Sequence, residues 1–329
     1  MQKDYVKGSI WGLAYGDAWG FPYEFKSHYE GHAALPSQMM VSDDTQMSLY
    51  VMQGILNAGF DQIHGLHECK ERKRLFLSII GQQLVQFHDD PDNNRAPGIS
   101  TMEALGKLKH LPDWAGEIQV SDKQSKGNGA NIRAPWIGLL PCLLEDKECL
   151  AGLQAWITHG HPMAIYASRL TVRCIHALIN NLVEQDEDLP LISWLQNSMQ
   201  RDESPETHDF LKQLDEAVVW ADHIRAYEDE DIAEILGKGA TADNALVNAL
   251  MVMDCWGWGS IWGRGLERLI ASTGDADSTA AIAGSMIGAV QGKRELNNFF
   301  WGFLPEKRYE TELIDIGHRI LELGDARVH

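Results

Sequence analysis

Two runs of small residues constrain the fold of this chain more than any other feature of its sequence. They recur every four residues, the first at Gly8, Gly12, Gly16 and Gly20 and the second at Ala276, Ala280, Gly284, Gly288 and Gly292. Positions four apart share one face of an α-helix, and glycine at such positions lowers helix stability. Close approach of another backbone would compensate for that cost. Each small-residue stripe is therefore predicted to lie at a tight helix crossing in the core.

The helix that carries the first stripe also contains a carboxylate, Asp17, and Glu24 follows shortly after it. A tight crossing would place both carboxylates beside the acidic segment around Asp275. The alternative is ordinary close packing, with no catalytic meaning for the glycines themselves. A membrane interpretation of the spacing is disfavoured, because the flanks of the stripes are polar and no run in the chain approaches the length of a membrane span.

Helical periodicity dominates the rest of the chain. Apolar residues recur at three- and four-residue spacing in the segments Met47–Leu56, Arg74–Phe87, Trp136–Leu144, Ala164–Leu182, Phe210–Tyr227, Ala245–Met253, Thr279–Val290 and Leu313–Leu323. We find no convincing alternation of apolar and polar residues, which is the pattern of strands, and no linker. A length of 329 residues is ample for a large core. These features predict an all-α fold in which residues 1–329 form a single compact domain.

The net charge and the cysteines limit the partners and the cellular compartment that we expect for the protein. Its net charge of −19 opposes binding to phosphate backbones and acidic lipids, so neither nucleic acid nor a membrane is expected as a partner. Five cysteines, an odd number with no C-x-x-C pair, are typical of reduced core thiols. The first residues contain no cleavable apolar segment. We therefore expect a cytoplasmic protein.

Two short acidic motifs stand far apart in the sequence, and each directly precedes an apolar helical run. The first motif is Ser42-Asp43-Asp44-Thr45, and the second is Gly274-Asp275-Ala276-Asp277-Ser278. Carboxylate and hydroxyl oxygens suit Mg²⁺, Mn²⁺ or Ca²⁺ better than zinc. If the motifs meet, two helix N-termini would supply only about half a positive charge each against four carboxylates. One or, with better balance, two divalent cations would be needed.

Helix capping is the alternative interpretation of each motif. Asp43 followed by Gln46 fits a capping box, and Asp275 or Ser278 could cap the second helix. One cap needs only one oxygen, however, whereas each motif carries two carboxylates and a hydroxyl. The repetition of this pattern in both motifs favours a shared metal site.

A glycine-rich stretch, Gly127-Asn128-Gly129, is predicted to open the helix at Trp136–Leu144. Its backbone N–H groups could hold a phosphate, although the same residues also form ordinary turns. No strand precedes the stretch, which argues against a Rossmann fingerprint, and the G-K-[ST] of a P-loop is missing. His159 lies in a turn before another helix, where capping or a surface position competes with ligand contact.

Nucleophilic catalysis ranks low for this chain. There is no G-x-S-x-G elbow, no H-E-x-x-H and no cysteine with a persuasive base partner. A cluster of carboxylates that holds hard cations suits metal-activated water instead.

These residues resemble the ADP-ribosylglycohydrolase family. The similarity spans most of the chain, and its landmarks occur in family order: Gly12-Leu13-Ala14-Tyr15-Gly16-Asp17-Ala18, Glu24, Ser42-Asp43-Asp44-Thr45, Arg95-Ala96-Pro97-Gly98, Gly127-Asn128-Gly129, Thr158-His159 and Gly274-Asp275-Ala276-Asp277-Ser278. The two acidic motifs are the specific part of this resemblance. Serine stands at positions 42 and 278, where the family often has threonine, and both keep a hydroxyl oxygen.

The resemblance implies a binuclear centre with two divalent cations, Mg²⁺ first and Mn²⁺ as the alternative. Its ligands would be Ser42, Asp43, Asp44, Asp275, Asp277 and Ser278. Catalytic roles would fall to Asp277, Asp44 and Glu24, with Asp277 or a neighbouring carboxylate taking a proton from water. The loop would bind substrate through Ser125, Gly127, Asn128 and Gly129, near the diphosphate, and His159 would lie on the adenosine side.

The implied reaction is hydrolysis of the bond between ADP-ribose and an acceptor on a modified protein or a small conjugate. Arginine is the first choice of acceptor, ahead of serine, O-acetyl-ADP-ribose and nucleic-acid adducts. Carboxylates near an oxocarbenium-like carbon would assist, by analogy with glycosidases. One competing class is an immunity protein that binds and neutralises an ADP-ribosyltransferase toxin, with or without hydrolase activity. Another is a metal hydrolase that cleaves phosphoesters.

Overall fold

The chain folds almost entirely into helices. The computed structural model describes residues 2–29, 31–111, 123–185, 187–227, 230–300 and 306–325. Its α-helices are α1 (Gln2–Gly20), α2 (Asp43–Ala58), α3 (Lys70–His88), α4 (Ile99–Lys109), α5 (Gly129–Ile132), α6 (Leu144–Thr158), α7 (Pro162–Ile179), α8 (Pro190–Met199), α9 (Pro205–Ala226), α10 (Ile232–Leu236), α11 (Ala242–Val252), α12 (Trp262–Ala271), α13 (Ala276–Phe299) and α14 (Lys307–Asp325). Short helical turns are η1 (Phe21–Tyr23), η2 (Phe60–Gln62), η3 (Pro135–Leu139) and the π-helical η4 (Met253–Gly257). Within these ranges the only β-type pairing is one isolated bridge between Gly127 and Thr241. The predicted all-α fold is confirmed.

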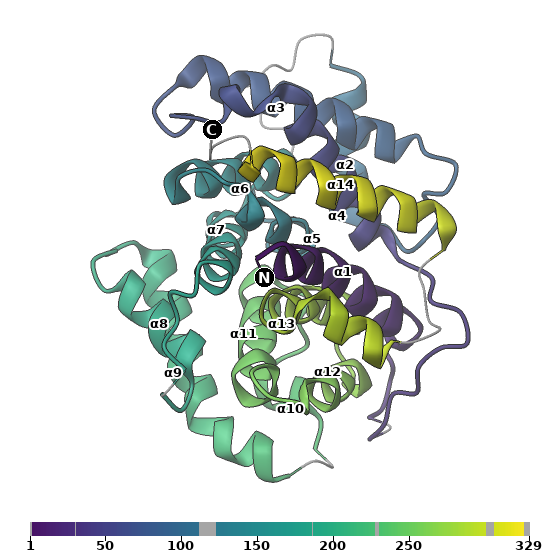
Figure 1. Cartoon of the computed structure of the whole chain (residues 1–329), viewed down its shortest axis with the longest axis vertical. Helices are drawn as coiled ribbons and strands as arrows, with labels where there is room; N and C mark the ends of the chain where they lie inside the picture. Colours follow the sequence, from purple (N-terminus) through teal and green to yellow (C-terminus); the bar gives the residue numbers. More distant parts are fainter. Residues whose placement is uncertain are drawn as a thin grey trace.

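The two small-residue stripes face each other along an antiparallel crossing of α1 and α13, which lie side by side at the centre of the molecule (Figure 1). A Cβ atom built on Gly12 would lie 2.0 Å from the carbonyl oxygen of Gly284, and one on Gly16 would lie 2.0 Å from that of Ala280. The neighbours are backbone atoms, so no side-chain rotation could make room. The prediction of a tight crossing is confirmed.

The far end of this crossing depends on a glycine conformation. Gly292 has φ of 80° and ψ of 162°, which kinks α13, and this region of backbone space is open mainly to glycine. A Cβ there would also lie 2.5 Å from Oδ2 of Asp4. Near the middle, the buried hydroxyls of Ser9 and Ser285 pair across the interface at 2.8 Å. The crossing thus contains little besides backbone and small polar groups.

One predicted helix is wrong. The segment Trp136–Leu144 forms only the short turn η3, and α6 starts afterwards at Leu144. Pro141 explains the difference, because a proline inside a helix removes a hydrogen bond and clashes with the preceding turn. Leu140, before the proline, has the extended ψ of 139° that this position favours. The glycine-rich stretch therefore opens the short helix α5.

The helices of the described ranges include none with the length and apolarity that a bilayer span requires.

Candidate functional site

The two acidic motifs meet at one end of the α1–α13 crossing. A Cβ on Gly20, the last residue of α1, would lie 2.4 Å from the Cα of Asp277 in the first turn of α13. Ser278 donates a hydrogen bond of 3.0 Å from its hydroxyl to Oδ2 of Asp44 in the first turn of α2. The predicted convergence of the motifs is therefore confirmed.

Asp17 connects α1 to the start of α2. Its carboxylate accepts hydrogen bonds from the backbone N–H of Ser42, at 3.0 and 3.1 Å, and from both the N–H and the hydroxyl of Thr45, at 3.1 and 2.5 Å. These three donor groups satisfy its buried oxygens. Asp17 thus holds the first acidic motif against α1, and the expectation that the crossing brings Asp17 to the site is confirmed.

The carboxylates form two groups with the spacing of metal ligands. Asp17, Asp44 and Asp277 make one group, and Glu24, Asp275 and Asp277 make the other. Within each group the candidate ligand atoms all lie within 4.8 Å of one another. Asp277 belongs to both groups.

Helix capping does not account for these carboxylates. Ser42, not Asp43, is the N-cap of α2, and its hydroxyl accepts a hydrogen bond of 3.1 Å from the N–H of Asp44. Asp275 occupies the N-cap position of α13, but its side chain makes no capping hydrogen bond. The proposed capping box at Asp43 is therefore wrong, and the carboxylates of Asp43 and Asp275 are left for the cleft.

Burial makes the ionised cluster electrostatically unfavourable without a counter-charge. Burial, and next the charge of Asp43, raises the pKa of Asp44 well above its ordinary value. Burial, and next the charge of Asp44, does the same to the pKa of Asp277. Half-buried Glu24 has its pKa raised to about 7, by burial first and by Asp275 second. These carboxylates bind protons, or cations, more readily than exposed ones.

The donor set fits hard divalent cations. Oδ2 of Asp275 accepts a hydrogen bond of 3.0 Å from Nδ2 of Asn128, whereas its Oδ1 is buried and has no hydrogen-bond partner. A buried carboxylate oxygen without a donor is costly, and a cation would satisfy it. Arg133 lies close enough to influence Asp43 and Asp44, but its guanidinium hydrogen-bonds to Gln154 and Thr158. Oxygen ligands of this kind match Mg²⁺ or Mn²⁺.

A cleft of about 260 Å³ opens onto the carboxylates. It is lined by Asp43, Asp44, Asp275, Asp277, Ser278 and Glu24, by Gly127, Asn128, Gly129 and His159, and by the segment around Ala96–Thr101. Two non-glycine residues on its wall have positive φ, Phe25 at 48° and Ala96 at 60°. Backbone strain of this sort concentrates at functional sites, which supports the cleft as the site.

Two of the predicted site residues do not line the cleft. Ser42 is fully buried, and its hydroxyl serves as the cap of α2. Ser125 lies two residues before the glycine loop, and its buried hydroxyl has no hydrogen-bond partner. Their roles as a metal ligand and a substrate contact stay predictions.

The glycine loop is tied to the second acidic motif. Asn128 donates from Nδ2 to the carbonyl oxygen of Gly239 at 2.8 Å as well as to Asp275. Gly127 and Gly129 pack against the ring of His159, since a Cβ on either would lie 3.1 Å from a ring atom. The structure thus gathers Gly127, Asn128, Gly129 and His159 on one wall of the cleft.

The sequence analysis assigned no role to Arg95 beyond its place in the Arg95-Ala96-Pro97-Gly98 motif. In the structure Arg95 ties together segments beside the cleft. Its carbonyl oxygen accepts a hydrogen bond of 3.2 Å from the N–H of Asp43. Its guanidinium donates to Val41, at 3.0 Å, and to both carboxylate oxygens of Glu306, at 2.5 and 3.1 Å. Arg95 therefore fixes the segment that holds the start of α2.

We expect Arg95→Ala to lower the free energy of unfolding by about 2 kcal/mol, because it removes a mostly buried bidentate pair, and to weaken Mg²⁺ binding. Chemical denaturation and a Mg²⁺ titration measure the two effects. Lys109→Ala is the control, because Lys109 pairs with Asp89 while 41% and 45% of the two side chains are exposed; its loss should cost less than about 1 kcal/mol. Equal losses for both variants would contradict the role of Arg95.

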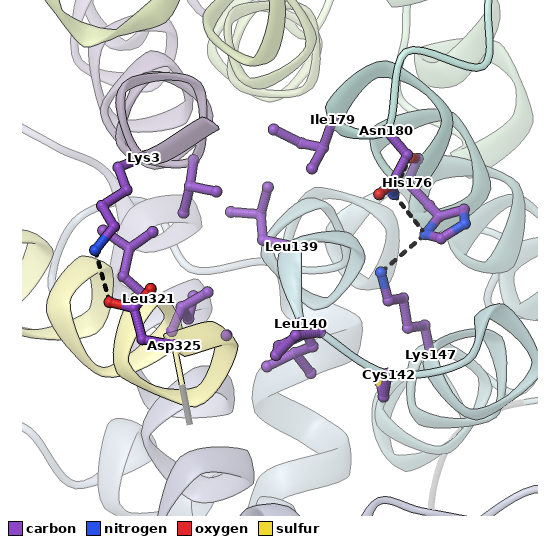
Figure 2. Close-up of a pocket in the computed structure, with 14 residues that line it drawn as sticks. Lys3, Leu139, Leu140, Cys142, Lys147, His176, Ile179, Asn180, Leu321 and Asp325 are labelled. Carbon is purple, nitrogen blue, oxygen red and sulfur yellow. Dashed lines mark hydrogen bonds and ion pairs between the residues drawn. The ribbon is translucent and has the colours of Figure 1, made fainter. Parts of the chain in front are cut away.

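A larger cavity, of about 430 Å³, lies elsewhere, between the start of α1, η3, α7 and α14 (Figure 2). From one side Lys147 donates to the carbonyl oxygen of Gly138, at 2.8 Å, and lies 2.9 Å from Nδ1 of His176. On the opposite side Lys3 pairs with Asp325 (Figure 2). This cavity shares no lining residue with the cleft. Its lining residues do not include a cluster of carboxylates, so the smaller cleft is the better candidate site.

The comparisons with known proteins agree with the observed fold. The family model of ADP-ribosylglycohydrolase matches residues 1–327. ADP-ribosylhydrolase ARH3 of Homo sapiens is 22% identical over 307 residues, covering 85% of this chain and 79% of its own. ADP-ribosylarginine hydrolase Tri1 of Serratia proteamaculans (strain 568) is 26% identical over 192 residues, covering 54% of this chain and 48% of its own. A solved structure, an ADP-ribosylglycohydrolase-related protein complex, is similar with a TM-score of 0.64 at 20% identity, covering 98% of this chain and 97% of its own, and so shares the fold.

Proposed function

The chain belongs to the ADP-ribosylglycohydrolase family, and from that membership we propose that it is a metal-dependent hydrolase that removes ADP-ribose from modified arginine side chains. The observation that carries the proposal is the convergence of the two acidic motifs in one cleft, with Asp277 common to both groups of candidate ligands. A cleft of this composition suits a polar substrate rich in hydroxyls. Arginine is supported as the acceptor by the name of the relative from Serratia proteamaculans, an ADP-ribosylarginine hydrolase.

The carboxylates and the glycine loop would bind different groups in the cleft. The carboxylates of Asp43, Asp44, Asp275 and Asp277, with the hydroxyl of Ser278, would hold two divalent cations, Mg²⁺ or Mn²⁺. When bound, such cations orient ribose hydroxyls and lower the pKa of water. Asp277 or Asp44 would accept the proton of the attacking water. Glu24 belongs to the same group of candidate ligands as Asp275 and Asp277. The wall formed by the glycine loop and His159 would bind the diphosphate and adenosine parts of the substrate.

The test is product analysis with ADP-ribosyl-arginine in the presence of Mg²⁺. We expect free ADP-ribose and arginine as products, no turnover after EDTA treatment, and recovery when Mg²⁺ or Mn²⁺ is added back. Parallel reactions with serine-linked ADP-ribose, O-acetyl-ADP-ribose and a phosphodiester define the bond that is cleaved. Cleavage of the phosphodiester alone, or turnover that persists in EDTA, would contradict the proposal.

A further inference from the structure

His159 is held from behind by two fully buried residues. Arg133 donates from Nη2 to the hydroxyl oxygen of Thr158 at 2.5 Å, and that oxygen lies 2.8 Å from Nδ1 of His159. Arg133 and Thr158 have no exposed surface, and His159 is 3% exposed. Gln154 completes the arrangement by accepting from Nε of Arg133 at 2.7 Å. The four residues form a buried polar chain that ends at the imidazole.

The direction of the hydrogen bonds in this chain follows from its donors. A guanidinium can only donate, so Thr158 accepts from Arg133. Within the described ranges, Nδ1 of His159 is the one acceptor within reach of the Thr158 hydroxyl. The hydroxyl hydrogen therefore points to Nδ1, which must carry the lone pair. In a neutral ring the proton then resides on Nε2.

The surroundings keep the ring neutral. Burial, and next the positive charge of Arg133, lowers the pKa of His159 to about 3. A protonated ring would also place hydrogen on Nδ1, opposite the hydroxyl hydrogen of Thr158. The geometry and the charge of Arg133 thus favour the same tautomer.

The other side of the ring belongs to the cleft. A Cβ on Gly127 would lie 3.1 Å from Nε2 of His159, and the ring and both loop glycines line the cleft. Thr158 is the only side-chain partner of the His159 ring in the part of the chain that the structure describes. A side chain at position 127 would crowd this nitrogen. Glycine there keeps the Nε2–H edge open toward the loop.

We propose that Arg133 and Thr158 are positioning residues that fix His159 as an Nε2–H donor, which takes an oxygen acceptor of the substrate. This inference rests on the proposed function for the identity of that substrate: the acceptor is an oxygen of the ADP-ribosyl group. A donor with a preset tautomer needs no proton rearrangement when the substrate arrives. Arg133 and Thr158 touch no substrate and act through His159.

Imidazole ¹⁵N NMR of the full-length protein tests the tautomer directly, because the shifts of the two ring nitrogens report which one carries the proton. His159→Gln identifies the resonances. We expect Nε2–H with an unprotonated Nδ1 in the wild-type protein and in Thr158→Ser, which keeps the hydroxyl, and a mixture of tautomers in Thr158→Val. Proton occupancy on Nδ1 of the wild-type protein, or an unchanged tautomer in a folded Thr158→Val, would overturn the proposal.

Kinetics with ADP-ribosyl-arginine supply the second measurement. Thr158→Val should raise KM about fivefold, the effect of one weakened hydrogen bond, with kcat nearly unchanged, and Thr158→Ser should restore KM. Ser168→Ala is the control: among the residues that the structure describes, this buried hydroxyl bonds only to the carbonyl of Ala164 in its own helix, so its loss should leave KM unchanged. A KM that does not rise in Thr158→Val would also count against the proposal.

A titration with free ADP-ribose separates this proposal from the proposed function. A shift of the Nε2 resonance on binding, without hydrolysis of any conjugate, would refute the proposed reaction and leave the role of His159 standing. Hydrolysis with no change at Nε2 would refute the role of His159 alone.

Discussion

Replacing Gly12 with valine is expected to prevent the protein from folding. The first added carbon would lie 2.0 Å from the carbonyl oxygen and 2.7 Å from the carbonyl carbon of Gly284. These atoms belong to the backbone of α13, so the two helices would have to separate along their shared face. Overpacking a core costs about 1–3 kcal/mol even where side chains can adjust, and here none can. Since most domains are stable by only about 5–15 kcal/mol, we expect insoluble or molten protein. Circular dichroism and thermal unfolding measure the outcome.

Alanine substitutions at two helical glycines provide a matched comparison. Gly12→Ala adds the same clashing carbon and should lower the free energy of unfolding by about 3 kcal/mol or more. Gly106→Ala, within α4, meets its nearest foreign atom at 3.8 Å, in ordinary contact. It should raise stability by about 0.5–1 kcal/mol through helix propensity. Changes of equal sign and size at the two positions would mean that the α1–α13 crossing is not as close as the structure has it.

The crossing also explains how the fold sets the geometry of the site. Gly20 touches the backbone of Asp277, and Asp17, one turn earlier, holds the start of α2. Motions that separate α1 from α13 would therefore pull the two acidic motifs apart. Small residues let α1 lie against α13 without side chains between them, which fixes the spacing of the carboxylates through rigid backbone.

The stripes and the acidic motifs could be predicted from the sequence because their signals are local. A four-residue spacing of small residues needs only helix geometry to be interpreted. A helix start at the first motif is also a local signal, although the sequence pattern favoured Asp43 as the cap and the structure has Ser42 there. In the structure the stripes and the acidic motifs form one arrangement. The second motif begins α13, the helix that carries the second stripe, and the first motif is held by Asp17 of α1, the helix that carries the first stripe.

The roles of Arg133 and Asp17 could not be predicted in the same way. Arg133 is fully buried because Gln154 and Thr158, in α6, accept its hydrogen bonds, and nothing near position 133 signals those partners. Asp17 lies within an apolar helix, and its hydrogen bonds come from Ser42, which precedes α2, and from Thr45 in the first turn of α2. Both residues depend on contacts between distant segments, which a pattern within one helix does not contain.

Replacing Asp277 with asparagine is expected to abolish turnover and to stabilise the metal-free protein. Asp277 belongs to both groups of candidate ligands, so its loss should reduce kcat by about a thousandfold or more, as for groups that act as a unit in catalysis. The same change removes one buried charge from a cluster of like charges, which should raise the free energy of unfolding in EDTA by about 1–3 kcal/mol at neutral pH. Activity assays and denaturation in EDTA measure the two effects.

The dependence of the stability of the metal-free protein on pH has a defined sign. Because the pKa values of Asp44 and Asp277 are raised in the folded state, the folded metal-free protein binds more protons than the unfolded chain once the pH exceeds the ordinary aspartate pKa. Its stability should therefore fall as the pH rises from that value through the raised ones. Asp277→Asn should flatten this slope, and saturating Mg²⁺ should oppose it by stabilising the ionised cluster.

A second buried carboxylate provides the control with the opposite sign. Asp254 accepts hydrogen bonds from the N–H groups of Leu191 and Ile192, at 3.0 and 2.8 Å, and from Nε1 of Trp258 at 2.9 Å. Asp254→Asn would turn one acceptor oxygen into a donor facing a donor, so it should destabilise the protein by about 1–3 kcal/mol. Burial raises the pKa of Asp254 as well, to about 6, so the contrast depends on the neighbours: Asp254 accepts three hydrogen bonds that asparagine cannot all accept, whereas Asp277 lies among other carboxylates. Destabilisation of metal-free Asp277→Asn would mean that its charge is already balanced by the protein, and the need for cations in the cleft would disappear.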